Sequence, residues 1–237
     1  MKSQIQVFFL IFHGLVVSPM DAQPKISIDL GLGIYEPLME GFDDNTEVFF
    51  PADNVLNRNM LLNWGVYYEF FSNARIGYNS YLSYDFGKLN LQNSKPVFSR
   101  SIQYRMVPLE TFFRWRPRIE LNFTLAAIWG RGKLTVETKP AGKTDDWNEL
   151  LNSFGDNDPM DEMGSSDVMI SDWIGFSGML GIRYYLSSRL GIDFKAGFLN
   201  NYYNHENWRI YSTKVQGPEM TIDDLPIFSL KVIYGLK

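Results

Sequence analysis

The 237-residue chain contains no cysteine. This absence excludes a disulfide scaffold, an iron–sulfur cluster and a cysteine-ligated zinc site, and it excludes a lipid anchor carried by cysteine. Histidine is nearly absent too, with only His13 and His205. The formal net charge is −5, whereas a nucleic-acid surface normally carries a basic stripe. We therefore expect no cofactor, no metal site and no nucleic-acid partner.

Apolar runs long enough for a membrane helix, about 20 residues, are missing after the N-terminus. The mean hydropathy of −0.17 agrees, because several membrane helices would raise it well above zero. The one short apolar run, Ile5–Val17, follows Lys2 and precedes Ala22. A positive residue, a short apolar stretch and a small residue at the cleavage position are typical of a secretory signal peptide. Residues 1–22 are therefore predicted to be a signal peptide.

Aromatic residues, in contrast, are abundant and make up 16% of the chain. Apolar and polar residues alternate, as where Leu190, Ile192 and Phe194 are separated by Gly191 and Asp193. A period of two indicates a β-strand with one apolar and one polar face. Eight such stretches lie near residues 26–34, 60–70, 76–86, 102–115, 119–129, 174–186, 190–198 and 228–236.

The fourth stretch changes phase. Ile102, Tyr104 and Met106 share one face, whereas Leu109 and Phe113 beyond Pro108 share the other. Such a change beside a proline predicts a β-bulge, which would keep all these apolar residues on one face. Arg105 would then point to the polar face.

The connections between the stretches alternate in length. Residues 72–74, 116–117 and 187–189 form tight turns, whereas residues 36–58, 88–100, 133–171 and 200–225 form long loops. Short turns at one end and long loops at the other are typical of outer-membrane barrels. We predict that residues 23–237 form an all-β, eight-stranded antiparallel up-and-down transmembrane β-barrel, with Thr144–Asp167 in an extracellular loop.

A soluble barrel with an apolar interior would show the same alternation. Three features favour an outward apolar face. Glycines such as Gly31, Gly65 and Gly181 gather on the polar face, where a narrow barrel is crowded. Apolar-face aromatics gather near the strand ends, as interfacial girdles do. The charges of the polar face nearly balance.

These charges are predicted to form a lumen charge network that closes the barrel. It consists of Asp29, Glu69, Asp85, Arg105, Glu110, Arg114, Glu120, Arg183, Asp193, Lys195 and Lys231. Counting back from the tight turns places Arg183 opposite Asp193 and Arg114 opposite Glu120. Barrel closure brings Lys231 towards Asp29. An eight-stranded barrel is just wide enough for its side chains to fill it or to hold one small ligand.

The hairpin Ile182–Asp193, with its Ser187-Ser188-Arg189 turn, resembles hairpins of small Gram-negative outer-membrane β-barrel proteins. The resemblance extends as a pattern over residues 24–237. It implies a location in the outer membrane, contact with outer-membrane lipid, and insertion by the outer-membrane assembly machinery.

The longest loop contains a candidate interaction stripe. Thr144 can cap a short helix that presents Trp147, Leu150, Leu151 and Phe154 on one side. This stripe packs over the barrel mouth or meets a loop partner that the sequence does not identify.

Enzymatic chemistry has little support. After signal cleavage His205 is the only histidine, and no serine motif accompanies it. The adjacent Glu206 would point the other way in a strand. We therefore expect a non-enzymatic barrel that acts through its extracellular loops or in envelope integrity. The alternatives are a narrow channel or binding pocket for small solutes or lipids, and a loop-site enzyme that uses His205.

Overall fold

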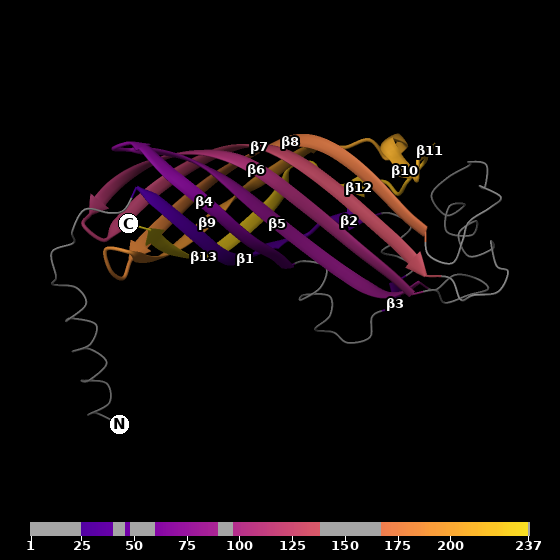
Figure 1. Cartoon of the computed structure of the whole chain (residues 1–237), viewed down its shortest axis with the longest axis horizontal. Coiled ribbons are helices and arrows are strands. Elements are labelled where there is room, and N and C mark those ends of the chain that lie inside the picture. The colour runs from indigo at the N-terminus through magenta and orange to yellow at the C-terminus, as the bar shows by residue number, and fades with distance from the viewer. Residues whose placement is uncertain (1–24, 40–45, 48–59, 90–96, 138–166, 237) are drawn as a thin grey trace, which may run out of the picture.

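The computed structural model describes residues 25–39, 46–47, 60–89, 97–137 and 167–236. Eight long strands dominate these residues (Figure 1). They are β1 (Ile26–Tyr35), β4 (Met60–Phe71), β5 (Ala74–Leu89), β6 (Val97–Arg116), β7 (Ile119–Glu137), β8 (Asp167–Tyr185), β9 (Leu190–Tyr202) and β13 (Leu225–Leu236). No helix in this described part of the chain is long and apolar enough to cross a membrane.

The eight strands close into an antiparallel barrel. Each pairs with the next in chain order, and β13 returns to pair with β1 from Ile26↔Leu236 to Tyr35↔Ile227. Closure satisfies the edges that an open sheet would expose, which a lipid-embedded sheet requires. The eight-stranded up-and-down barrel predicted from the alternation is thus confirmed.

Short turns join β4 to β5, β6 to β7 and β8 to β9, and we call the side on which they lie the turn end. In the last of these turns the Leu186 amide donates to the Leu190 carbonyl at 2.8 Å, and Ser187 Oγ accepts from the Leu190 amide at 3.0 Å. The opposite side is the loop end, which carries the small strands.

At the loop end, β10 (Trp208–Ile210) and β11 (Thr213–Val215) form a hairpin, and β10 pairs with Met169 and Ile170 near the start of β8. A short 3₁₀ helix, His205–Asn207, precedes it. β3 (Thr46–Glu47) pairs with β5, and β2 (Leu38–Met39) pairs with β12 (Met220–Thr221).

The apolar face points outward, as predicted. Leu30, Leu125 and Leu180 in the middle of their strands are 70%, 51% and 66% exposed, whereas the residues that precede them, Asp29, Thr124 and Met179, are buried. A continuous belt of exposed aliphatic and aromatic side chains this large indicates a lipid-facing surface.

The predicted bulge at Pro108 is wrong. β6 pairs with β7 in one unbroken register from Val97↔Glu137 to Arg114↔Glu120, with Pro108 opposite Ala126. Even-numbered residues point inward throughout, so Tyr104 is fully buried in the lumen and Arg105 is exposed on the outer wall. The apolar residues change phase because the lumen changes from charged to apolar along its axis, while the strand continues without a shift.

The loop-end half of the lumen is an apolar layer. It contains Tyr35, Leu61, Tyr81, Ile102, Tyr104, Met106, Ala126, Ile128, Trp173, Met179, Leu199, Ile222, Leu225 and Ile227. A second cluster, made of Phe98, Leu134, Val136, Met169, Trp208 and Ile210, continues it beneath the β10–β11 hairpin. The charged residues around Glu110 lie on the turn-end side of this layer, whereas the buried pair of Arg100 and Asp85 lies at the loop end, between Phe98 and Ile102 on β6.

Candidate functional site: the lumen charge network

Six residues form the centre of the lumen charge network, and all of them are buried. They are the cations Arg75, Arg183 and Lys195 and the carboxylates Glu110, Glu120 and Asp193. Three strands supply the carboxylates and three supply the cations. The network therefore ties β5, β6, β7, β8 and β9 together across the lumen.

Glu110 is the hub of the network. Its Oε1 lies 2.7 Å from Arg75 Nε and 3.2 Å from Arg183 Nη2, and its Oε2 is bound by Lys195 Nζ. Thr124 Oγ1 donates to the same Oε2 at 3.0 Å. A carboxylate removed from water needs several donors to offset its desolvation, and this geometry provides them.

Arg183 bridges the other two carboxylates. Its Nη2 lies 2.8 Å from Asp193 Oδ2, and its Nη1 lies 3.5 Å from Glu120 Oε1. Glu120 is also bound by Arg75 and accepts a 3.3 Å hydrogen bond from the Tyr185 hydroxyl. Arg183 and Asp193 are direct partners in the β8–β9 register, as the turn length predicts.

Glycine makes space for these long side chains. A Cβ at Gly181 would lie 2.4 Å from Asn122 Oδ1 and 2.8 Å from Lys195 Cγ. Since Cβ atoms essentially never come this close to other atoms, a larger residue would displace the network. This crowding explains why glycines gather on the inward face.

Three pairs flank the centre. Lys231 Nζ lies 3.3 Å from Asp29 Oδ2 and 5.0 Å from the centre of the Tyr81 ring. Arg114, which is 40% exposed at the turn-end mouth, lies 3.3 Å from Glu69. The third pair is separate from the centre and joins Arg100 Nη2 to Asp85 Oδ2 at 3.1 Å.

The structure places the predicted network residues inside the barrel or at its turn-end mouth, with one exception. Asp29, Glu69, Asp85, Glu110, Arg114, Glu120, Arg183, Asp193, Lys195 and Lys231 all have ion-pair partners there. Arg105 lies on the outer wall instead, because β6 has no bulge at Pro108. The stripe at Trp147, Leu150, Leu151 and Phe154 lies outside the described residues, as does the predicted signal peptide, residues 1–22.

Two inward arginines were missed. Arg75 is in phase with the inward Gly77 and Asn79, but it directly follows the turn, where alternation is too short to assign a face. Arg100 falls in a segment that the sequence assigned to a loop, whereas β6 begins at Val97. Extending each alternation by a few residues would have identified both.

Aromatic side chains form a ladder in the lumen on the loop-end side of the charges around Glu110. The Tyr104 ring lies edge-on to Tyr35 at 6.0 Å and to Trp173 at 6.2 Å, and Trp173 lies edge-on to Tyr203 at 5.5 Å. Trp173 Nε1 donates to Asn201 Oδ1 at 3.0 Å, which satisfies its only polar group in the apolar layer.

Tyr203 joins β10 and the segment around Pro218 at the loop end. Its hydroxyl accepts from Trp208 Nε1 at 2.6 Å and donates to the Pro218 carbonyl. Burial raises the pKa of this hydroxyl above its ordinary value.

The network offers little for metal binding or catalysis. Each central carboxylate is engaged by cations, and no cluster of three or more His, Asp or Glu suited to a metal occurs among the described residues. His205 lies partly exposed in the 3₁₀ helix at the loop end, away from these carboxylates. The arrangement is instead suited to holding strands together and filling the lumen.

Neither a family model nor a curated protein matches the sequence. Solved structures match in fold. The outer membrane protein OprG from Pseudomonas aeruginosa superposes with a TM-score of 0.50 at 10% identity, over 91% of this chain and 97% of that one. Neisserial surface protein A gives 0.48 at 7% identity, over 91% and 100% of the two chains. Ail of Yersinia pestis gives 0.44 at 13%, over 90% and 97%.

The chain therefore has the fold of the small outer-membrane β-barrels, as the resemblance of its hairpins implied. That fold and the apolar belt agree with the outer-membrane location expected from the sequence.

Proposed function

We propose that the protein is a non-enzymatic outer-membrane barrel whose lumen is closed, and that it acts through its loop end or by strengthening the envelope. The observation that carries this proposal is the stacking of two filled layers along the lumen. The charged layer around Glu110 lies nearer the turn end, and the apolar layer around Tyr104 and Trp173 lies nearer the loop end.

The two layers oppose solute passage for different physical reasons. In the charged layer, cations and carboxylates neutralise one another, so a passing ion would have to break buried pairs. In the apolar layer, an ion would lose its hydration among aromatic side chains that offer few hydrogen bonds. A barrel of eight strands has little room for a water column beside these side chains.

Planar-bilayer recording of the refolded full chain tests the proposal. We expect no steady conductance from the wild type. The conductance of Gly130→Ala is compared with that of the wild type, because this variant disturbs the apolar layer without removing a charge. A steady open channel in the wild type would favour the alternative function, passage of small solutes.

A further inference from the structure

The outer wall of the barrel changes from apolar to charged along one line at the loop end. Going towards that end, the outward residues of β6 are Leu109, Val107 and then Arg105. β7 shows the same change from Trp129 to Arg131, and β8 shows it from Ile174 to Asp172. Trp129 is opposite Arg105 in the strand register, so Arg131 and its partner Asp172 lie one step nearer the loop end than Arg105. Over β6, β7 and β8 this line marks the loop-end limit of the lipid-facing belt.

Arg105 differs from the arginines of the lumen because no carboxylate of the described residues pairs with it. Its hydrogen-bond partner is neutral, since Nη2 donates to Gln103 Oε1 at 3.1 Å, and Gln103 in turn donates to Ser80 Oγ at 3.3 Å. An arginine on a lipid-facing wall is costly near the membrane midplane and much less so near the interface. Its place at the upper limit of the belt keeps this cost low and leaves a charge open to a ligand.

The neighbouring charges also favour an anion. Asp172 Oδ1 lies 2.6 Å from Arg131 Nε, and its Oδ2 lies 3.1 Å from Arg209 Nη2. One carboxylate therefore faces two guanidinium groups, and Arg105 adds a third cation beside them. Arg131 is opposite Gln103 in the β6–β7 register, which brings it diagonally next to Arg105.

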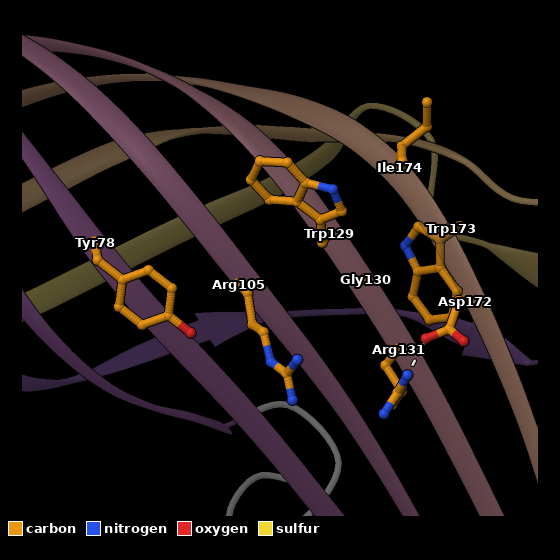
Figure 2. Close-up of a pocket in the computed structure, with 8 residues that line it drawn as sticks. All are labelled: Tyr78, Arg105, Trp129, Gly130, Arg131, Asp172, Trp173 and Ile174. Atoms are coloured by element: carbon orange, nitrogen blue, oxygen red, sulfur yellow. Dashed lines mark hydrogen bonds and ion pairs between the residues drawn. The ribbon is translucent and has the colours of Figure 1, made fainter.

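A groove of about 470 Å³, open to the outside, lies between these groups (Figure 2). The side chain of Arg105 lies between Tyr78 on one side and the Arg131–Asp172 pair on the other, with Trp129 above it in this view. Tyr78, Trp129 and Ile174 are exposed and belong to the apolar belt. The groove thus has an apolar border towards the membrane interior and a cationic border towards the loop end.

We propose that this groove binds the phosphate of an anionic membrane lipid in the leaflet that faces the loop end. Arg105 and Arg131 hold the phosphate oxygens, because the planar guanidinium matches their geometry and strengthens each hydrogen bond by its charge. Tyr78, Trp129 and Ile174 contact the glycerol region and upper acyl chains, the depth at which Trp and Tyr gather in membrane proteins. The proposal does not depend on the lumen being closed.

Native mass spectrometry of the refolded full chain, released from mixed phosphatidylglycerol and phosphatidylcholine nanodiscs, tests the proposal. We expect wild-type protein to retain phosphatidylglycerol in preference to phosphatidylcholine. Arg105→Gln should lower that retention about tenfold, and Arg105→Lys should give an intermediate value because the charge remains without the planar fork.

Arg116→Gln is the matched control, because it removes an exposed arginine beside Trp115 at the turn end. It should retain the lipid like the wild type. Equal loss in Arg116→Gln, or unchanged retention in folded Arg105→Gln, would overturn the proposal. If Arg105→Gln does not refold, Arg105→Lys and Trp129→Ala decide by the same readout. Excess inorganic phosphate separates the two sources of the anion, since full displacement of the lipid would assign the groove to free phosphate and overturn a lipid site.

Discussion

Arg183 on β8 and Asp193 on β9 lie directly opposite each other in the strand register, and 2.8 Å separates their side-chain nitrogen and oxygen. Both are completely buried in the lumen. Arg183 also reaches Glu110 at 3.2 Å, so it joins two carboxylates that would otherwise repel each other.

This pair gives the first prediction. Arg183→Ala should lower the free energy of unfolding by about 3–5 kcal/mol, because it leaves carboxylates buried with fewer cations. The double variant Arg183→Ala with Asp193→Ala should lose less than the sum of the single variants, since one unpaired carboxylate is removed as well. Urea unfolding in lipid vesicles measures all three. Additive losses would show that water already screens these charges.

The second prediction concerns the fit of Trp173 against Gly130. A Cβ at Gly130 would lie 2.0 Å from Trp173 Nε1, so Gly130→Ala must displace the indole and weaken its hydrogen bond to Asn201. We expect a loss of about 1–3 kcal/mol, typical of overpacking. Gly132→Ala on the same strand is the milder comparison, because its Cβ would lie 3.2 Å from Trp173 and Trp208, which a shift of a few tenths of an ångström relieves. Equal stability of the two variants would contradict the tight packing of the apolar layer.

The third prediction concerns the lipid-facing belt. Leu125→Arg and Leu180→Arg should each cost about 2–4 kcal/mol, because a charge near the membrane midplane is poorly solvated. Leu125→Met and Leu180→Met keep the side chain apolar and should change stability little. Unfolding in vesicles measures the differences. Arginine variants as stable as their methionine controls would show that this face does not meet lipid.

The fourth prediction concerns export. Cleavage after Ala22 would give a mature chain that begins at Gln23, close to the start of β1 at Ile26. Intact-mass measurement of protein extracted from membranes should therefore lack residues 1–22. A mass that includes Met1 would refute the signal-peptide assignment.

The fifth prediction concerns orientation in the membrane. The short turns lie at one end of the barrel, so residues 144–167 are expected on the cell exterior. Protease added to whole cells should cut within them and leave the strands intact. Cutting that requires a permeabilised outer membrane would indicate the reverse orientation.

The outward face had to be predicted from further signals, namely the inward glycines, the balanced charges and the aromatic residues at the strand ends, and the alternating loop lengths indicated the barrel. Alternation by itself predicted the strand number, because lipid demands an apolar residue at every second position of a spanning strand. It failed from Ile102 to Met106, where the inward face is itself apolar and the outward face carries Arg105 and Gln103. A rule that equates apolar with outward must then introduce a bulge that the chain does not have.

The centre of the network was only partly predictable. Local turn geometry fixes Arg183 opposite Asp193, which are ten residues apart. The contact of Arg75 with Glu120 spans 45 residues and crosses the lumen between strands that are not neighbours in the barrel. No periodicity encodes such a contact, because it depends on the width and stagger of the closed barrel.

The eight strands differ greatly in length. β6, β7 and β8 have 20, 19 and 19 residues, whereas β1 and β4 have 10 and 12. A tilted strand crosses the hydrocarbon with about 9–11 residues, so roughly half of each long strand extends beyond it. The barrel thus ends in a slanted rim, tall over β6–β8 and low over β1 and β4. A macromolecule diffusing in the membrane plane would therefore meet a tall wall of strands from one direction and a low one from the other.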